Sequence, residues 1–461
     1  MKILLVNPSP WSNINSRLAQ SVNRAQGIYP PLGLAYNAAI LEQNGHEVKI
    51  LDCYAENLTE QQTLSRIKKF SPDLVGVYAM TPLVQEAYKI SRMAKQQGIT
   101  TVIGGPQMFA YPAETVSNPS IDYGIAWEGE ISFPQFTDFL EKKARINEVE
   151  GLVYKQGKRI KQNPGRTLAK LDELPFPARH LLKNNLYGSI LSKRPYTTTM
   201  TSRGCPYHCD YCFKPPTENR MRFRSGKNVA DEIEHCIKKY GTREIWFYDD
   251  TFTINRKHVR EVCKEILKRR IKISWQAPTR VDVLDENTLK LMKQAGCEML
   301  RLGIESGDEE TLKLMNKKTS LKIIKNAVRM LKQTDIKIFG FFMLGYPGET
   351  LKSMEKTIKL PRELDLDWAM FSKVTPFPKT PLYEKCLKQG LINDYWKEFT
   401  LEKTEHKMMD VYPEAGRKVD QAFKQFYLRP SYFVKKIKEL GEPGKFFQYV
   451  KGLKAIMMFE Q

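Results

Sequence analysis

The sequence predicts an α/β protein with an amino-terminal doubly wound, Rossmann-like domain, a partial barrel of six strand–helix units and a small helical carboxyl-terminal region. Three observations predict it. Short apolar strands alternate with helical patterns through the first 140 residues, and a second such series runs from about residue 196 to 383. Glycine or polar motifs follow the strands in both series. At 461 residues the chain also exceeds one ordinary core, since a domain takes about 100 to 200 residues.

The first domain is placed at residues 1–145. Strands are expected at 2–7, 46–51, 74–78 and 101–103, with helices at 32–44, 59–70 and 84–97. Strands that alternate with helices form a parallel sheet covered on both faces. Ligands of such sheets bind at the carboxyl ends of the strands. The residues expected there are Asn7, Asp52, Thr81, Gly104 and Gly105.

A linker is expected at residues 146–194, with a small hairpin near 151–158 and a proline-rich strap at 171–177. The barrel follows at residues 195–390. Its strands are expected at 196–201, 244–248, 274–277, 299–304, 338–344 and 369–374. Polar or glycine motifs follow these strands, which predicts an active site at their carboxyl ends.

Three cysteines after the first barrel strand carry the chemistry: Cys205, Cys209 and Cys212. A cubane iron–sulfur cluster normally has a thiolate on each of its four irons, so three thiolates leave one iron open for catalysis. A structural zinc site with His208 as fourth ligand is the alternative. It is disfavoured because His208 adjoins Cys209, whereas zinc ligands usually come as two separated pairs. The five other cysteines are scattered, which is typical of a reducing compartment.

The cysteine spacing, with aromatic Tyr211 before the last cysteine, resembles the signature of radical S-adenosylmethionine (SAM) enzymes. In that family the open iron binds SAM, and one electron cleaves it to a 5′-deoxyadenosyl radical. The resemblance and side-chain chemistry together imply SAM-binding roles. Tyr211 would meet the adenine through its backbone, Glu305 would bind the ribose and Arg280 the carboxylate. A surface ion pair with Asp282 is the alternative for Arg280.

Three further positions complete the expected SAM site. Asp249 or its neighbour Asp250 would take the SAM amino group or face the substrate. Gly345 and Gly348 would let the chain pass close to the adenosyl group.

The first domain resembles the cobalamin-binding domain that precedes the radical core in one large class of SAM enzymes. The resemblance lies in the runs 29–35, 52–57, 104–106 and 128–130. It implies a corrin above the strand ends, with its nucleotide tail running into the sheet. The implied cobalamin-binding residues are Asn7, Thr81, Gly104, Gly105 and Glu128. For the glycine pair alone, an ordinary tight turn is the alternative.

Tyr54 stands where histidine-ligating cobalamin domains have their histidine. We therefore expect cobalamin without a protein histidine ligand from the Asp52 loop. A domain that has lost cobalamin would show the same feature.

The two resemblances together imply a 4Fe–4S, cobalamin-dependent radical SAM methyltransferase. Its substrate would be a small or lipid-like molecule, methylated at an unactivated carbon. An electron donor such as flavodoxin or ferredoxin would reduce the cluster. The alternatives are cyclisation, oxidation or carbon–carbon coupling without methyl transfer, and a non-enzymatic iron–sulfur redox or sensor protein.

Net charge is +21, and no nucleic-acid module is recognised, so no nucleic-acid partner is expected. The amino terminus lacks a signal-peptide pattern, so a cytoplasmic protein is expected. The helical region at 391–461 ends in a tail, 423–459, that mixes aromatic side chains with Lys435, Lys436 and Lys438. Contact with anionic lipid at the inner membrane face and packing of the aromatics against the barrel both remain open.

Overall fold

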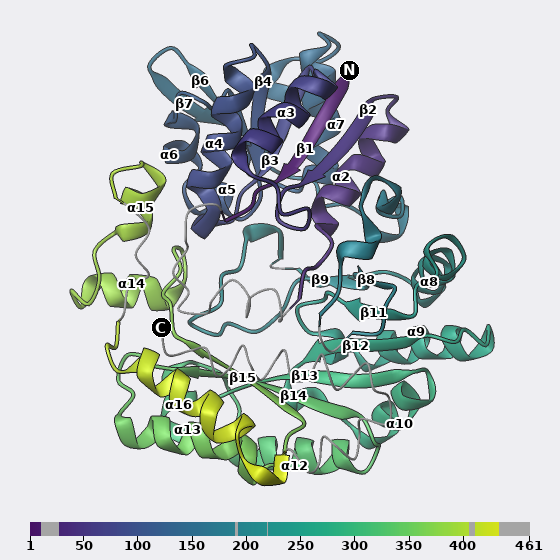
Figure 1. The fold of residues 1–461 in the computed structure, drawn as a ribbon, viewed down its shortest axis with the longest axis vertical. Helices are drawn as coiled ribbons and strands as arrows, with labels where there is room; N and C mark the ends of the chain where they lie inside the picture. The colour runs from purple at the N-terminus through teal and green to yellow at the C-terminus, as the bar shows by residue number, and fades with distance from the viewer. Residues whose placement is uncertain (11–26, 190–191, 219, 405–410, 433–461) are drawn as a thin grey trace.

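The computed structural model describes residues 1–10, 27–189, 192–218, 220–404 and 411–432. Two sheets occupy opposite ends of the molecule, the amino-terminal one at the top of Figure 1 and the barrel at the bottom. The predicted α/β architecture is confirmed.

The amino-terminal sheet has seven strands in the order β2-β1-β3-β4-β5-β6-β7, and β1 to β5 are parallel. The strands are β1 Lys2–Asn7, β2 Glu47–Asp52, β3 Leu74–Tyr78, β4 Thr100–Gly104, β5 Tyr123–Ile125, β6 Leu152–Gln156 and β7 Arg159–Gln162. The helices are α2 Leu32–Gln43, α3 Glu60–Phe70, α4 Val84–Lys95, α5 Gln107–Ala110, α6 Pro112–Ser117 and α7 Gly129–Leu140.

Alternate side chains of β1 enter two different cores, as a two-residue period requires. Ile3 and Leu5 pack with α2 and α7, whereas Leu4 and Val6 pack with α3 and α4. The sheet is therefore doubly wound, as predicted. Helix α3 begins where expected because Thr59 forms a capping box with Gln62.

The hairpin of β6 and β7 lies in the segment predicted as linker, yet it continues the amino-terminal sheet. Strand β6 pairs antiparallel with β5, from Tyr123↔Tyr154 to Ile125↔Leu152. The first sheet therefore extends past residue 145. Short 3-10 turns complete the connection: η2 Ile146–Glu148, η3 Leu171–Glu173, η4 Arg179–Leu181 and η5 Asn184–Leu186.

The barrel contains six parallel strands in the order β15-β14-β13-β12-β11-β8, and its two edge strands do not pair with each other. The strands are β8 Tyr196–Thr199, β11 Glu244–Phe247, β12 Ser274–Thr279, β13 Cys297–Glu305, β14 Lys337–Leu344 and β15 Trp368–Lys373. A two-stranded sheet of β9 Ser202–Arg203 and β10 Arg222–Phe223 stands beside them. The predicted partial barrel is thus present.

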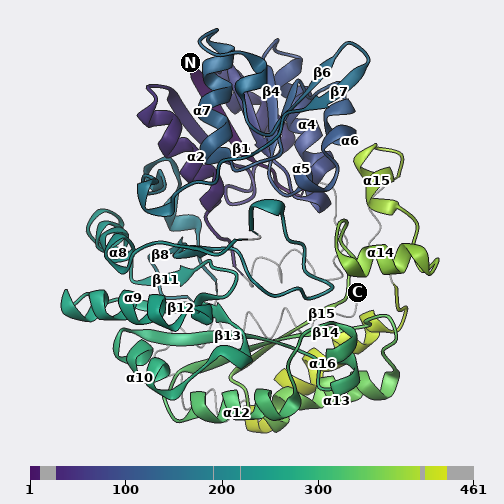
Figure 2. The same cartoon turned by 180° about the vertical axis from the view of Figure 1, so that it is seen from behind.

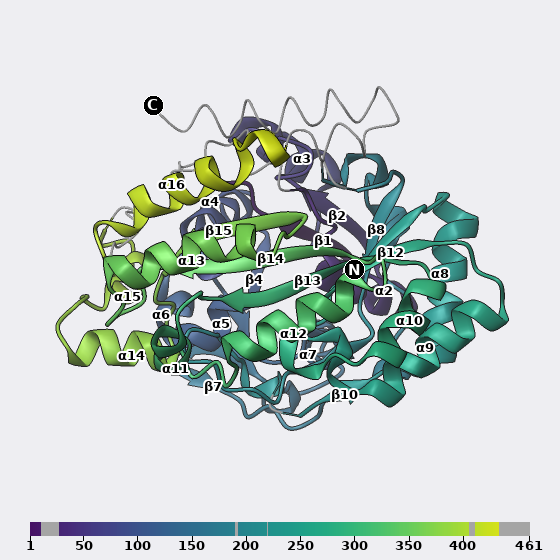
Figure 3. The ribbon, with the colours of Figure 1, turned by 90° about the horizontal axis from the view of Figure 1, so that it is seen from below.

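Helices cover the outside of the barrel, as the view from below shows (Figure 3). They are α8 Gly226–Tyr240, α9 Arg256–Lys268, α10 Glu286–Gln294, α11 Glu309–Leu314, α12 Leu321–Lys332 and α13 Leu351–Glu363, with 3-10 turns η6 Pro216–Glu218, η7 Phe252–Ile254 and η8 Val281–Val283. Ile245 and Phe247 of β11 enter the core beneath these helices, whereas Trp246 between them packs edge-on against Tyr29 of the first domain.

The carboxyl-terminal helices bind both domains. Helix α15 Tyr395–Thr400 lies beside α4 and α6 of the first domain, and α14 Pro381–Lys388 lies below it in Figure 2. Helix α16 Ala415–Tyr427 covers β15, where the Tyr427 hydroxyl donates to the Ala369 carbonyl over 2.7 Å. Phe426 and Tyr432 are buried in that contact, which favours the packing alternative for these aromatics.

The basic part of the tail, with Lys435, Lys436 and Lys438, lies outside the described residues, so its predicted lipid contact stays a prediction. Within the described parts of the chain, we find no helix with the length and apolarity needed to cross a membrane.

Candidate active site

The three cysteines lie on one loop whose base is the β9–β10 pair, because Cys205, Cys209 and Cys212 all fall between these strands. All three are free thiols. Among the residues that the structure describes, no three His, Cys, Asp or Glu side chains meet so as to hold one metal ion. A cluster binds each thiolate to a different iron, so its ligands need not meet at one point. The donor set therefore fits a cluster with one open iron.

Asp249, at the carboxyl end of β11, fastens the strand that leads into the loop. Its carboxylate accepts bonds from the Thr201 amide (2.8 Å), the Thr201 hydroxyl (2.6 Å) and the Ser202 hydroxyl (2.6 Å). Burial raises the pKa of Asp249 to about 6 despite these bonds. Asp250 is exposed and accepts from the Gly204 amide over 3.1 Å. Both carboxylates thus position the loop, and the predicted contact with SAM stays a prediction.

Arg280 follows β12 and lies against the cysteine loop. Its guanidinium sits 3.6 Å from the Tyr207 ring centroid, and Nη1 lies 3.5 Å from the Cys209 sulfur. The expected alternative partner is also present, since Nε and Nη2 each donate to Asp282 over 2.9 Å. Nη2 also donates to the Lys317 carbonyl over 2.6 Å. The Arg280 cation is therefore held beside a thiol that would be an anion in a cluster.

Glu305, at the end of β13, has a buried partner that the sequence analysis missed. Lys317 Nζ lies 2.8 Å from Glu305 Oε1 and 3.1 Å from the Tyr211 hydroxyl. Both charged side chains are almost fully buried. Glu305 also has a φ of 69°, a conformation that non-glycine residues rarely adopt. Lys317 is one of 73 basic residues and had no strand-end position to distinguish it.

The turn that carries Lys317 also forms hydrogen bonds with backbone groups of the cysteine loop. The Asp210 amide donates to the Met315 carbonyl over 3.1 Å, and the Asn316 side chain donates to the His208 carbonyl over 2.6 Å. The turn therefore contacts the loop at three residues, His208, Asp210 and Tyr211.

Gly345 and Gly348 both have positive φ values, 86° and 91°. A Cβ at Gly345 would lie 2.6 Å from the Ala415 Cβ, so its missing side chain makes room for α16. The Gly345 and Tyr346 amides donate to Glu349 Oε2 over 2.7 and 3.1 Å. Burial raises the pKa of Glu349 to about 7. The predicted approach of these glycines to the adenosyl group stays a prediction.

The carboxyl ends of β1, β3 and β4 form the face that the sequence assigned to cobalamin. Asn7 donates to Asp52 over 2.9 Å, and Thr81 is buried at the start of η1 Thr81–Leu83. Gly105 has a φ of 103°, and a Cβ there would lie 2.8 Å from the Ala79 carbonyl and the Tyr78 ring. A Cβ at Gly104 would meet nothing within 4 Å. At Gly104 this face thus leaves open space beside the backbone, which fits the predicted corrin tail.

The Glu128 carboxylate is bound by three protein groups. It accepts hydrogen bonds from the Ala169 amide (2.7 Å), from Arg203 Nη1 (3.2 Å) and from Arg222 Nη1 (3.0 Å). Its carboxylate thus joins the first domain to the base of the cysteine loop. Its predicted contact with cobalamin stays a prediction.

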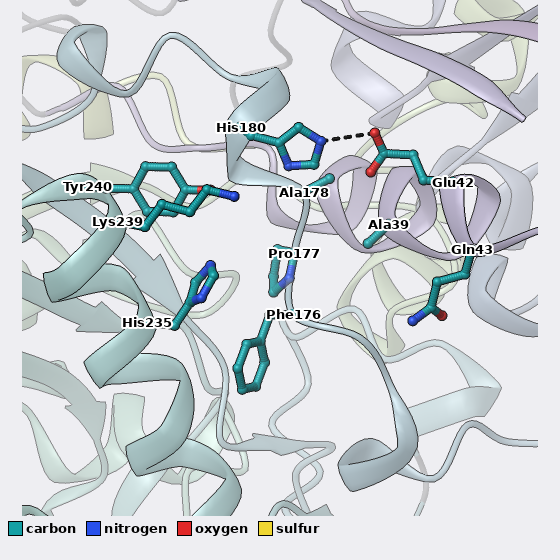
Figure 4. A pocket seen from close by; sticks show the side chains of 10 residues that line it. All are labelled: Ala39, Glu42, Gln43, Phe176, Pro177, Ala178, His180, His235, Lys239 and Tyr240. Atoms are coloured by element: carbon teal, nitrogen blue, oxygen red, sulfur yellow. Dashed lines mark hydrogen bonds and ion pairs between the residues drawn. The ribbon is translucent and has the colours of Figure 1, made fainter. Parts of the chain in front are cut away.

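A hollow of about 380 Å³ lies elsewhere, between α2, the proline-rich strap and the end of α8 (Figure 4). His180 Nε2 lies 2.9 Å from Glu42 Oε1 at its edge, and His235 and Phe176 face each other at 5.7 Å. None of the cysteine-loop or strand-end residues lines this hollow. It marks the junction of the three segments and is separate from the chemistry.

Comparison with known proteins agrees with both halves of this site. The Radical SAM superfamily matches residues 199–360, and the B12 binding domain matches residues 21–137. A Pyrococcus horikoshii protein named as an uncharacterized methyltransferase is 35% identical over 446 residues, covering 95% of both chains. The anaerobic magnesium-protoporphyrin IX monomethyl ester cyclase of Rubrivivax gelatinosus is 30% identical, covering 86% of this chain and 72% of its own.

Solved structures share the fold at lower identity. The radical SAM methyltransferase TsrM of Kitasatospora setae, with cobalamin and a 4Fe–4S cluster bound, matches with a TM-score of 0.70 and 20% identity, covering 84% of this chain and 78% of its own. OxsB, a cobalamin-dependent SAM radical enzyme, matches with a TM-score of 0.74 and 16% identity, covering 98% and 70%. The chain therefore belongs to the radical SAM enzymes that carry an amino-terminal B12-binding domain and use a 4Fe–4S cluster, SAM and cobalamin.

Proposed function

We propose that the protein transfers a methyl group to an unactivated carbon of a small or lipid-like substrate. The observation that carries the proposal is the contact between the cysteine loop and the B12-binding domain. Glu128, three residues beyond β5, binds Arg203, two residues before Cys205. The ends of the two parallel sheets therefore meet, and two cofactors held there would address one substrate.

Residues of both domains support this proposal, because each domain has groups suited to one of the two cofactors. Cys205, Cys209 and Cys212 would hold the cluster, and the strand ends around Gly104 and Gly105 would hold cobalamin. When bound, the cluster and SAM supply an organic radical and cobalamin supplies a methyl group. Arg280 places a cation beside Cys209, which favours negative charge on the loop. Asp249 keeps the loop's leading strand in place.

Aromatic side chains between the two domains support a substrate with an apolar face. Tyr248, next to Asp249, is 55% exposed, although it is a large apolar side chain. Its ring lies 5.3 Å from Trp246, which in turn lies 4.6 Å from Tyr29 of the first domain. A ring or chain that covered Tyr248 would remove apolar surface from water, at about 25 cal/mol per Å².

Cyclisation remains the second candidate, because the Rubrivivax gelatinosus relative is named as a cyclase. Mass spectrometry of the product separates the two. Methyl transfer adds one CH2 to the substrate, whereas cyclisation adds no carbon. An external reductant such as flavodoxin or ferredoxin is part of the proposal, since the chain would need one electron for each SAM cleavage.

The testing experiment is anaerobic reconstitution with iron, sulfide and hydroxocobalamin, followed by incubation with SAM, a reductant and an extract of small molecules. We expect 5′-deoxyadenosine, S-adenosylhomocysteine and a product that carries the CD3 group of labelled SAM. Substrate-dependent 5′-deoxyadenosine together with a product that carries no labelled methyl group would reject methyl transfer and favour the cyclase-type reaction.

A further inference from the structure

The base of the cysteine loop contains two arginines in an arrangement that is unfavourable in isolation. Arg203 of β9 and Arg222 of β10 are direct cross-strand partners. Like charges at such positions repel each other. Each strand has only two residues, so the pair has little backbone hydrogen bonding of its own. The two side chains are nevertheless largely buried, with exposed fractions of 14% and 16%.

Two carboxylates of the first domain compensate these charges. Glu128 binds both arginines, with Arg203 Nη1 at 3.2 Å and Arg222 Nη1 at 3.0 Å, and Glu130 binds Arg203 Nη2. Both carboxylates are 6% exposed. Burial alone would raise the pKa of Glu128, but Arg222 and Arg203 together hold it below its usual value. The four side chains form a balanced cluster, with both acids from the first domain and both bases from the loop.

Two further contacts connect the arginines to the first domain and to the segment just before the strap. The Arg203 guanidinium lies 5.8 Å from the ring centroid of Tyr36 in α2, and Arg222 Nη1 donates to the Ala169 carbonyl over 2.8 Å. The Glu128 carboxylate also accepts from the Ala169 amide. Arg222 is therefore held by the Ala169 carbonyl and by the carboxylate that holds Arg203.

We propose that Arg203 and Arg222 are positioning residues, and that docking of Glu128 and Glu130 onto them holds the cysteine loop in the shape that retains the iron–sulfur cluster. The B12-binding domain thereby controls cluster retention in the barrel. An undocked domain would leave two adjacent arginines at the loop's base without the Glu128 and Glu130 carboxylates, and the loop would open there. The proposal rests on the cluster assignment under the proposed function.

The test compares Glu130→Gln and Glu128→Gln with wild-type enzyme after identical reconstitution. We measure iron and sulfide per chain, the rate of iron release to a ferrous chelator, and the electron paramagnetic resonance spectrum of the reduced cluster. Glu130→Gln should release iron about tenfold faster, and Glu128→Gln faster still. If Glu128→Gln does not fold, the single-contact variant Glu130→Gln decides the question.

Two further proteins separate positioning from general stability. Glu148→Gln removes an exposed ion pair with Arg145 in the same domain, and it should release iron as wild type does. The double variant Glu130→Gln with Arg203→Gln removes the uncompensated charge. It should recover thermal stability while still releasing iron quickly.

Wild-type iron retention and an unchanged spectrum in Glu130→Gln would overturn the proposal, even with a lowered melting temperature. That result would make the ion cluster a domain contact only. A wild-type enzyme that retains its cluster but methylates nothing would reject the proposed function and leave this test intact. A wild-type enzyme that binds no iron would reject both.

Discussion

The two faces that meet between the domains are built in opposite ways. The barrel face is dense with polar contacts among protein groups: Asp249, Arg280 and Lys317 each bind two or more atoms of the chain. Among the described residues of the B12-binding face, a Cβ at Gly104 would meet nothing within 4 Å. The cysteine loop thus arrives preorganised, whereas the strand ends of the first domain form a platform with open space beside the backbone at Gly104. Substitutions should therefore act differently on the two faces.

The largest effect is expected at the cysteines. Cys209→Ala should abolish the ~400 nm iron–sulfur absorbance and all formation of 5′-deoxyadenosine, since two thiolates cannot hold the cluster with one open iron. The matched control is Cys236→Ala, a buried cysteine of α8 away from the loop, which should keep both signals. A Cys209→Ala enzyme that still cleaves SAM would contradict the cluster assignment.

On the platform, Gly105→Val should remove cobalamin and leave the barrel active. Its Cβ would lie 2.8 Å from the Ala79 carbonyl, and the positive φ of 103° adds strain. Cobalamin occupancy should fall at least tenfold, while uncoupled SAM cleavage changes less than twofold. Gly98→Val is the control, because Gly98 also has a positive φ, 73°, but open space around it. An equal fall in cobalamin occupancy in both variants would show that the strain of a positive φ, and not the close contact at Gly105, causes the loss.

Cobalamin bound to the wild-type platform should lack a histidine ligand from the Asp52 loop, because Tyr54 stands at that position. The Co(II) electron paramagnetic resonance spectrum should then show no nitrogen superhyperfine splitting from the protein. A three-line splitting that becomes two-line when only the protein histidines carry 15N would locate a histidine ligand and refute the expectation.

Within the barrel, Lys317→Met tests whether preorganisation rests on buried charge. It leaves Glu305 buried without its cation, and breaking a buried pair destabilises a protein by about 3–5 kcal/mol. Urea unfolding should show this loss together with weaker SAM cleavage. The exposed pair Lys313–Glu310 provides the control, since Lys313→Met should change stability by less than about 1 kcal/mol. Similar losses of unfolding free energy in the two variants would show that the buried Lys317–Glu305 pair does not preorganise the site.

Much of this arrangement was predictable because it depends on local sequence patterns. The expected strands of both sheets lie within a few residues of their bounds, since apolar period and flanking turns determine them, whereas the short strand β5 was not expected. The residues at the strand ends follow from the same patterns. The missed features depend on residues far apart in sequence. Lys317 meets Tyr211, and the β6–β7 hairpin pairs with β5 although it follows the predicted boundary.

Gly345 and Glu128 show the same limit in residues that the sequence did single out. Both were assigned to ligands, which stays a prediction, and the structure adds partners that the sequence did not indicate: Ala415 against Gly345 and two arginines on Glu128. Neither periodicity nor spacing reports partners of this kind, because the contacts join residues far apart in sequence. A strand-end motif therefore predicts that a residue lies near the site, and the structure is needed to say what it binds.

The smallest effect concerns Glu349, which accepts two amides beside Gly345. Burial raises its pKa from 4.5 to about 7 in the folded protein, so the folded state binds a proton that the unfolded state has lost between these values. Its contribution to stability is therefore present below about pH 4.5 and is lost as pH rises through 7. Glu349→Gln keeps an oxygen for the Gly345 and Tyr346 amides but cannot ionise. Relative to wild type, the variant should gain up to about 3 kcal/mol in unfolding free energy between pH 5 and pH 8. Urea unfolding of the cofactor-free protein at both pH values measures this difference, with Glu355→Gln, a partly exposed residue of α13 paired with Lys418, as control. A difference that does not change with pH would show that the pKa of Glu349 in the folded protein is close to its unfolded value, and that burial does not raise it.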